Sequence, residues 1–300
     1  MPRRFAAADI GSNTVHLLVG EITSRGTVRR VVNESEWLSL GEIVSLEGKI
    51  PAADCARLME TLRRYKRLAE ENGAEQLYVF ATEAVRVARN HDELLASIRK
   101  TLGIRVDLIS GQREAELSLL GVALDTHIHN SVLMIEVGGG SAQVALCDGK
   151  AIVDEQSLPI GTGRIIGQFN LKQPALPDSL EEIRRHIKGF WHQCPQPQEG
   201  VTMVASGGVA RGIIRALHPD GDGMIQLYEL DYLVRSIMGL EVQTIAKRFR
   251  VKLKRAGSLL PGAVVFQEML RHYGQDRFLV SEFGVREGAI LEIARAEVVR

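Results

Sequence analysis

The sequence has few cysteines and few aromatic residues. Its 300 residues include three cysteines, Cys55, Cys147 and Cys194, and none of them forms a C-x-x-C pair. An odd and scattered set is typical of reduced thiols rather than of a disulfide framework, so we expect a cytoplasmic protein. Aromatic residues make up only 5% of the chain, which leaves few rings on which nucleic-acid bases could stack.

The sequence also lacks an excess of charge and any long apolar run. Its 37 Lys and Arg residues balance 37 Asp and Glu residues, so the formal net charge is +0. Proteins that bind nucleic acids or membrane surfaces usually carry a net basic field, and we expect neither partner here. No run approaches the roughly 18 apolar residues that span a bilayer. Asp9 interrupts the apolar stretch near the N-terminus, which argues against a secretory signal.

Strand and helix patterns alternate along the chain, which is typical of an α/β fold. The pattern breaks near residues 125–130 and then returns to a strand-rich opening, so we predict two domains, 1–125 and 126–300, with a last helix able to pack back on the first domain. The expected elements of the first half are strands at 5–11, 15–22, 28–37, 76–82 and 105–110, and helices at 51–73, 91–102 and 114–124.

A glycine turn that follows an acidic residue occurs twice. Residues 9–14 read Asp-Ile-Gly-Ser-Asn-Thr and residues 136–141 read Glu-Val-Gly-Gly-Gly-Ser, and each lies between two apolar runs. Glycines allow close approach of a ligand to the backbone, and exposed N–H groups form anion sites. An acid at the end of the strand can hold a divalent cation. A third glycine turn, Ser206-Gly207-Gly208, opens a helix whose N-terminus favours anions.

These motifs, with others in the same order, resemble the exopolyphosphatase/guanosine pentaphosphate phosphohydrolase (Ppx/GppA) family. The resemblance covers nearly the whole chain and is supported by ADIGSNTVHLLV (8–19), ATEAVRVARN (81–90), ISGQREAELSLLGV (109–122), IEVGGGSAQV (135–144), SLPIGTGR (157–164), ASGGVA (205–210), LLPGAVVF (259–266) and VSEFGVREGAI (280–290). It implies two ribonuclease-H-like domains of the actin–hexokinase–chaperone ATPase superfamily, with an active cleft between them.

The resemblance also implies roles for individual residues. Glu114 matches the carboxylate that activates the attacking water, and Arg86 matches an arginine that binds phosphate. Asp9, Glu136 and Gln143 fall where the family places residues associated with Mg²⁺, for which Mn²⁺ is an alternative. The phosphate-binding residues would be Gly11, Ser12, Asn13, Thr14, Arg86, Gly138, Gly139, Gly140, Ser141, Gly207 and Gly208.

The position of Glu114 in the sequence supports the role of general base independently of the resemblance. Ser110 or Gly111 is expected to cap the helix, which places Glu114 in its first turn. The helix dipole there favours the ionised carboxylate by roughly 0.3–1 kcal/mol, and a general base must be ionised. The same position is equally good chemistry for an ordinary helix start.

Two residues depart from the family pattern at the second glycine turn. Glu136 stands where the family usually has Asp, and Gln143 stands where it has Glu. Gln143 can hydrogen-bond water but supplies no charge. The change predicts weaker metal binding or slower turnover.

Three functions therefore stay open. The first is release of terminal phosphate from polyphosphate or a guanosine polyphosphate, the second is a catalytically weak sensor that binds these molecules, and the third is a kinase on the same superfamily fold. The resemblance also allows a homodimer.

Other clusters have simpler explanations. The basic run at 247–255 suits a polyanion and equally a solvated strand or loop. His127 and His129 have no clear third metal ligand. His91-Asp92 resembles a metal-binding HD pair, but helix capping by Asn90 explains it better.

Overall fold

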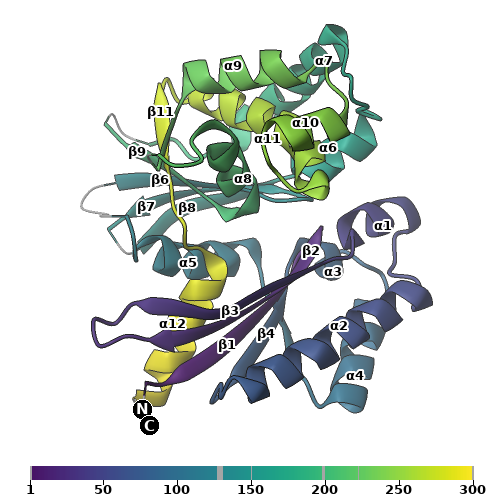
Figure 1. The fold of residues 1–300 in the computed structure, drawn as a ribbon, viewed down its shortest axis with the longest axis vertical. Helices are drawn as coiled ribbons and strands as arrows, with labels where there is room; N and C mark the ends of the chain where they lie inside the picture. The colour runs from purple at the N-terminus through teal and green to yellow at the C-terminus, as the bar shows by residue number, and fades with distance from the viewer. Residues whose placement is uncertain (1, 127–130, 150, 198–199, 222, 299–300) are drawn as a thin grey trace. The chain divides into compact units, whose positions relative to one another are not determined.

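The computed structural model describes residues 2–126, 131–149, 151–197, 200–221 and 223–298. The chain divides into two compact units. Unit 1 comprises Met1–His127 and Phe283–Arg300, and unit 2 comprises Ile128–Glu282. The last helix, yellow in Figure 1, therefore belongs to the same unit as the first strands of the chain.

Unit 1 contains a five-stranded sheet in the order β3-β2-β1-β4-β5. Its first three strands pair antiparallel, while β4 and β5 run parallel to β1. Its elements are β1 (Arg4–Ile10), β2 (Thr14–Ile22), β3 (Val28–Trp37), α1 (Leu40–Glu47), α2 (Ala52–Glu71), β4 (Leu77–Ala81), α3 (Glu83–Arg86), α4 (His91–Leu102), β5 (Val106–Leu108), α5 (Gly111–Val122) and α12 (Val285–Val298).

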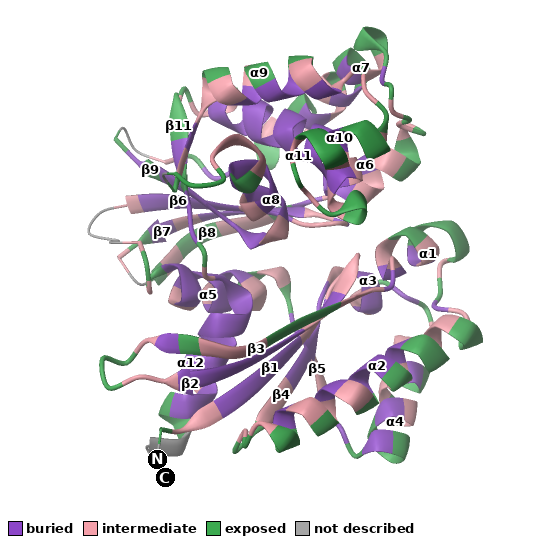
Figure 2. Cartoon of the chain, in the orientation of Figure 1, coloured by how far each residue is buried: buried purple, intermediate pink, exposed green. Residues whose placement is uncertain are grey.

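Both faces of this sheet are covered, as the buried residues in Figure 2 show. In β1, Ala6 and Ala8 pack into the core beneath α2 and α4, whereas Phe5 and Ala7 pack into the core formed with α12. Successive side chains of a strand point to opposite faces, so an unbroken apolar strand is what a central, doubly covered position requires.

Helix α12 packs against α5 at two glycines, where no side chain fits between the two backbones. A Cβ on Gly288 would lie 1.8 Å from the Leu117 carbonyl oxygen, and one on Gly121 would lie 2.0 Å from the Gly284 carbonyl oxygen. On the sheet side, the buried Glu287 accepts a hydrogen bond from Arg30 of β3 at 2.8 Å. The C-terminal helix therefore fixes α5, the helix that carries Glu114.

Unit 2 has a six-stranded sheet in the order β10-β11-β9-β6-β7-β8. Strands β6, β7 and β8 pair antiparallel, β9 is parallel to β6, and β11 is parallel to β9. Its elements are β6 (Ser131–Val137), β7 (Ala142–Asp148), β8 (Ala151–Leu158), α6 (Thr162–Gln168), α7 (Pro177–Lys188), the 3₁₀ helix η1 (Trp191–Gln193), β9 (Thr202–Ser206), α8 (Gly207–Leu217), β10 (Met224–Gln226), α9 (Leu227–Ile237), α10 (Val242–Arg248), α11 (Leu253–His272) and β11 (Arg277–Val280).

The two units share one strand arrangement: three antiparallel strands followed by two parallel strands on the other side of the first. This is the order of a ribonuclease-H-like domain, and it confirms the predicted α/β class. Unit 2 differs by one further edge strand, β10, which pairs antiparallel with β11.

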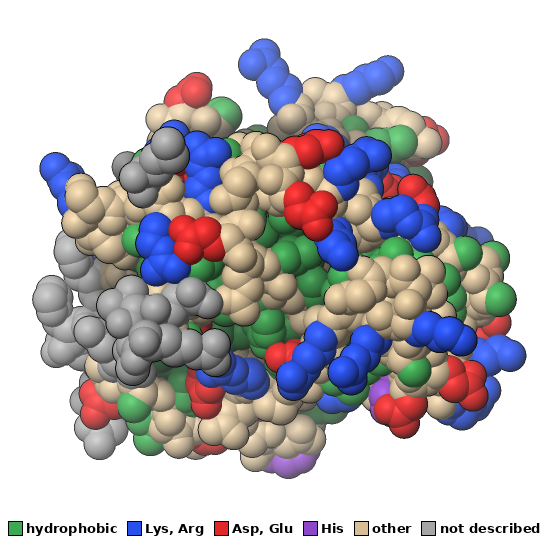
Figure 3. Space-filling model, turned by 90° about the horizontal axis from the view of Figure 1, so that it is seen from below, with side chains coloured by type: hydrophobic (Ala, Val, Ile, Leu, Met, Phe, Trp, Pro, Cys, Tyr) green, Lys and Arg blue, Asp and Glu red, His purple; other side chains and the backbone are tan. Residues whose placement is uncertain are grey.

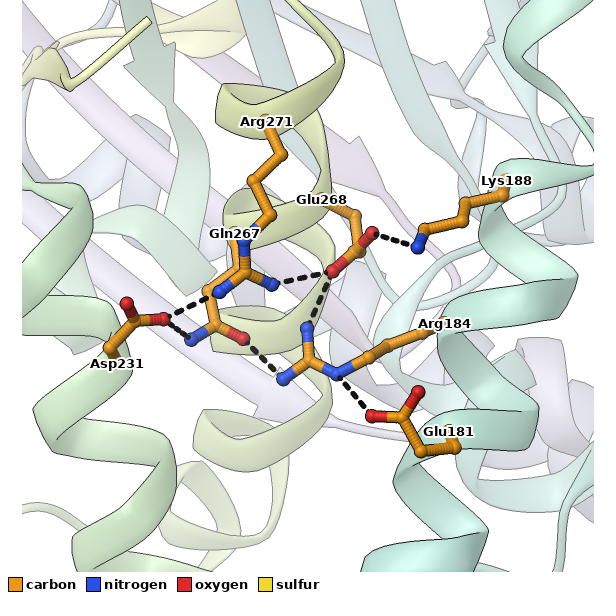
Figure 4. Close-up of polar contacts among 7 residues, drawn as sticks. All are labelled: Glu181, Arg184, Lys188, Asp231, Gln267, Glu268 and Arg271. Carbon is orange, nitrogen blue, oxygen red and sulfur yellow. Dashed lines mark hydrogen bonds and ion pairs between the residues drawn. The ribbon is translucent and has the colours of Figure 1, made fainter. Parts of the chain in front are cut away.

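A polar network holds the helices of unit 2 together (Figure 4). Glu268 of α11 is only 1% exposed, and its carboxylate accepts hydrogen bonds from Arg184 of α7 at 2.5 Å and from Arg271 at 2.7 Å. Gln267 links the same arginine of α7 to Asp231 of α9 through bonds of 2.8 and 2.6 Å. A buried carboxylate needs such partners, so the network fixes α7 and α9 against α11.

Some local expectations were wrong. Asn90 precedes α4, but its side chain makes no capping bond, because it pairs with the backbone N–H and carbonyl of Ile50 at 3.0 and 2.9 Å. The run 247–255 forms the end of α10, a short connection and the start of α11 rather than a strand or a simple loop. His127 and His129 lie outside the described residues.

One face of the molecule carries charges of both signs. On the face drawn in Figure 3, Lys and Arg side chains lie among Asp and Glu side chains. Within the ranges that the structure describes, no helix is both long enough and apolar enough to span a membrane.

Candidate active site

The first glycine turn, residues 11–14, is called loop 1. The Gly11 N–H donates to the Thr14 carbonyl at 3.1 Å and closes the turn. The Ser12 carbonyl accepts from the Gly41 N–H at 2.7 Å, and the Asn13 carbonyl accepts two N–H groups of the segment before α1 at 3.0 Å each. The carbonyls of Ser12, Asn13 and Thr14 are thus satisfied within unit 1. The N–H groups of Ser12 and Asn13 make no hydrogen bond to a described residue, and they can receive an anion.

The second glycine turn, residues 138–141, is called loop 2 and has the same backbone bond. The Gly138 N–H donates to the Ser141 carbonyl at 2.9 Å. Arg164 of α6 holds the loop from behind, because its N–H donates to the Gly139 carbonyl at 3.0 Å and its Nε donates to the Gly140 carbonyl at 2.9 Å. The carbonyl groups are again directed into the unit, as in loop 1.

Each loop also rests on a glycine of the following segment. A Cβ on Gly41 would lie 2.8 Å from the Ser12 Cβ, and a Cβ on Gly161 would lie 2.5 Å from both the Gly140 carbonyl carbon and the Ser141 nitrogen. Real Cβ atoms do not approach so closely, so both positions require glycine. The repeat seen in the sequence is therefore a repeated backbone structure with the same kind of support.

The two acidic residues occupy equivalent positions in the two sheets. Asp9 pairs with His16 across β1 and β2, and Glu136 pairs with Gln143 across β6 and β7. Both acids are partly buried, and Gln143 is only 5% exposed. The Ser206 hydroxyl donates to Glu136 Oε2 at 2.8 Å. Glu136 is thus held in place by the end of the neighbouring strand β9.

Glu114 lies in the first turn of α5, as expected. The Ser110 side chain caps this helix by accepting the Arg113 N–H at 3.1 Å, and the Glu114 N–H donates to the Ser110 carbonyl at 3.0 Å. Strands β1, β4 and β5 are parallel, so the residues that follow them emerge at one edge of the sheet. Asp9, at the end of β1, and Glu114, after β5, therefore lie at the same edge of unit 1.

Arg86 is tied to the connection that leads into α5. Its Nη1 donates to the Ile109 carbonyl at 2.7 Å, one residue before the helix cap Ser110. The rest of its guanidinium remains available to an anion, and the role in binding phosphate stays a prediction. The observed bond gives Arg86 a second effect, which is to position the segment that carries Glu114.

An arginine of α11, which the sequence did not single out as a site residue, packs against the third glycine turn. Gly207 has φ +85° and packs on the Glu136 carboxylate, and a Cβ on Gly208 would lie 2.7 Å from Nη1 of Arg255. Burial and the neighbouring Arg215 lower the pKa of Arg255. The Arg255 guanidinium makes no ion pair or hydrogen bond with any described residue, although it stays protonated. A desolvated cation beside another cation favours an anionic ligand at the start of α8.

The spacing of two glycines in α8 indicates from the sequence that a long side chain packs on this helix. Gly208 and Gly212 are four residues apart, so they form a flat strip on one face of α8. A Cβ on Gly212 would lie 2.9 Å from the Arg255 Cδ. The strip accommodates the arginine side chain, but only the tertiary structure shows which residue fills it.

The structure holds no preformed cluster of metal ligands among its described residues: no three His, Cys, Asp or Glu side chains lie close enough together to hold an ion. Mg²⁺ does not need such a cage, because it commonly binds one or two carboxylates, several waters and the phosphates of a substrate. The Asp9 carboxylate beside loop 1 and the Glu136 carboxylate beside loop 2 provide donors of that kind. The metal and the cleft between domains stay predictions.

Comparison with known proteins identifies the family. The model of the Ppx/GppA phosphatase family matches residues 18–297. The chain belongs to this family. A curated relative, exopolyphosphatase 1 of Mycobacterium leprae, is 27% identical over 311 aligned positions that cover 96% of this chain and 88% of the relative.

Solved structures give the same result for this Ppx/GppA protein. The family member from Aquifex aeolicus superposes with a TM-score of 0.85 at 25% identity and covers 99% of both chains. An exopolyphosphatase from Cytophaga hutchinsonii, 22% identical over 98% of both chains, has the same fold with a TM-score of 0.84.

Proposed function

We propose that the protein is a Mg²⁺-assisted phosphohydrolase that releases the terminal phosphate of inorganic polyphosphate. The observation that carries the proposal is the pair of loops with identical backbone bonds, each of which directs its carbonyls inward and follows an acid at the end of a strand. The curated relatives named exopolyphosphatase match nearly the full length of this chain, which supports the substrate.

In this proposal Glu114 is the general base. Its position in the first turn of α5 favours the ionised carboxylate, which accepts a proton from water. The water oxygen then bonds to the terminal phosphorus, the bond from that phosphorus to the bridging oxygen breaks, and the shortened chain leaves with the bridging oxygen. The proton on Glu114 returns to solvent or to the product.

The loops stabilise the charge that develops on the phosphoryl oxygens. The N–H groups of loop 1 and loop 2, with the hydroxyls of Ser12, Thr14 and Ser141, are donors of the kind that phosphoryl transfer requires. Arg86 and Arg255 add positive charge. Asp9 and Glu136 would hold Mg²⁺, which supplies further charge neutralisation when it is bound.

Guanosine pentaphosphate is the second substrate that we propose to test, because it presents the same kind of terminal phosphoanhydride to the loops.

One observation favours a different function, a sensor that binds these molecules with little turnover. Gln143 is buried opposite Glu136, so a position that the family uses for a carboxylate has no charge.

A substrate panel with phosphate detection tests the proposal. Long-chain polyphosphate, tripolyphosphate and guanosine pentaphosphate are each incubated with the wild-type protein at several Mg²⁺ and Mn²⁺ concentrations. We expect metal-dependent phosphate release from polyphosphate. Tight binding of polyphosphate without release at any metal concentration would reject the enzyme and support the sensor.

A further inference from the structure

The segment 247–255, called the basic segment, is the most strongly charged part of unit 2. Five of its cations are exposed, namely Lys247, Arg248, Arg250, Lys252 and Lys254. The sequence has no acidic residue between Glu241 and Glu268. The basic segment therefore concentrates positive charge along a chain that has no net charge.

Lys247 and Arg248 end α10, where a helix favours cations, but the cations at the start of α11 are placed against the usual preference of a helix. Lys252 precedes α11, Lys254 and Arg255 lie in its first turn, and this turn has no acidic residue. The N-terminus of a helix carries partial positive charge, so cations there raise the free energy of the unliganded protein. An anion bound at this end would be attracted both by the cations and by the N–H groups of the helix.

The basic segment leads directly to the phosphate-binding part of unit 2. It ends at Arg255, whose side chain lies on Gly208 at the start of α8, beside the third glycine turn. The exposed cations are thus continuous along the chain with the arginine that reaches this turn. A linear anion held at the turn has basic groups along which its remaining phosphates can extend.

The composition of the segment distinguishes between kinds of polyanion. Phe249 is its only aromatic residue, and it is packed partly into the core of unit 2, with Arg248 5.6 Å from its ring centroid. No exposed ring is offered to a base, whereas single-stranded nucleic acids are usually bound through stacking. The segment suits a chain of phosphates without bases.

We propose that the basic segment binds the part of a long polyphosphate chain that lies beyond the reacting end. This rests on the proposed function for the identity of the substrate. Binding of polyphosphate by the basic segment predicts that long chains bind more tightly than tripolyphosphate. The difference in affinity should decrease as the salt concentration rises, because exposed charges are screened.

The test measures binding separately from hydrolysis. In a Glu114→Gln background, which is expected to bind without turnover, Lys247, Arg250 and Lys252 are changed to Gln, and the affinities for long-chain polyphosphate and tripolyphosphate are measured at several salt concentrations. We expect about tenfold weaker binding of the long chain, little change for tripolyphosphate, and a smaller salt dependence.

The matched control removes three exposed cations from unit 1, by changing Arg63, Arg67 and Lys100 to Gln. It should bind both ligands as the background protein does, and the unfolding temperature of each variant shows whether it is folded. Unchanged affinity for the long chain, or equal loss of affinity for both chain lengths, would overturn the inference.

The outcomes separate this inference from the proposed function. Chain-length-dependent binding through the segment, in a wild-type protein that releases no phosphate, would support the segment and reject the hydrolase. Phosphate release by the wild type, with long-chain affinity that does not depend on the segment, would support the hydrolase and reject the segment.

Discussion

At the scale of single residues, position 143 departs from the pattern that the family resemblance implies. Gln143 and Glu136 face each other across two antiparallel strands, and opposite side chains of such a pair are direct neighbours. An uncharged amide there avoids repulsion in the protein without metal. The same amide would leave the proposed Mg²⁺ with one negative ligand fewer in unit 2.

Replacing Gln143 with Glu should make the stability of unit 2 depend on bound Mg²⁺. Two opposed and partly buried carboxylates should lower the free energy of unfolding by about 1 kcal/mol, and Mg²⁺ should restore it. Thermal unfolding with and without Mg²⁺ checks this, and phosphate release should saturate at lower Mg²⁺ than in the wild type. Gln156→Glu, on the neighbouring strand β8, is the control, and an equal response of both variants to Mg²⁺ would contradict the assignment.

Two half-buried histidines should make the protein less stable in mild acid. His186 packs between Phe169 and Phe190, with ring centroids 5.2 Å away in each case, and His272 stacks on Trp191 at 4.5 Å. Burial lowers the pKa of both below the ordinary value of 6.5. The unfolded chain therefore binds protons first as the pH falls below about 6.5, and the free energy of unfolding decreases.

The unfolding temperature, measured from pH 7.5 to pH 5, checks this prediction. Replacing His186 and His272 with Phe should flatten the decrease, because the Phe side chains do not titrate. Replacing the exposed His192 with Gln should leave the decrease unchanged. A double variant that loses stability in acid as steeply as the wild type would show that other groups cause it.

At the scale of elements, each glycine loop is positioned by residues of the segment that supports it. Loop 2 is held between Arg164 of α6 and Gly161, whose missing side chain allows contact with the loop backbone. The sequence predicted the loops because glycines and acids recur at one spacing. It could not predict their supports, because the contact of Gly161 depends on the path of a segment twenty residues further along the chain.

Gly161→Ala should displace loop 2. The added Cβ would meet backbone atoms at 2.5 Å, so we expect a loss of about 1–3 kcal/mol in stability and a larger relative loss in phosphate release. Gly167→Ala is the matched control, because nothing lies within 4 Å of a Cβ there. On the exposed face of α6 it should raise stability by about 0.5–1 kcal/mol. Unfolding temperatures and phosphate release by the two variants check both expectations, and equal effects would contradict the role of Gly161.

At the scale of the whole molecule, the chain begins and ends in unit 1. Most element positions follow from the periodicity and the turn residues, because β1 and β6 each precede a recognisable glycine turn, whereas the strand order was expected only from the family resemblance. Other features depend on contacts between distant segments. The Asn90 side chain binds the backbone of Ile50 instead of capping α4. The position of the Arg255 side chain depends on the two glycines of α8 against which it packs.

A chain that ends at Glu282 should fail to form a stable unit 1. Its core would lose buried side chains of α12, including Val285, Ile290, Leu291 and Ile293. At roughly 1.5–3 kcal/mol each, their loss approaches the whole 5–15 kcal/mol by which domains are usually stable. Circular dichroism and limited proteolysis check this, with Arg295→Ala on the exposed side of α12 as the control. A truncated chain whose unit 1 resists proteolysis as the full chain does would contradict the role of α12.

The central claim is that Glu114 activates water at the terminal phosphate, and one comparison tests it most directly. Initial rates of phosphate release from saturating polyphosphate with Mg²⁺ are measured for the wild type, for Glu114→Gln and for Glu116→Gln, which changes a neighbouring carboxylate on the same helix. The account predicts a loss of about 10²–10⁴-fold for Glu114→Gln with polyphosphate binding retained, and a rate within a few-fold of wild type for Glu116→Gln. Release by Glu114→Gln at a rate close to that of the wild type would contradict it.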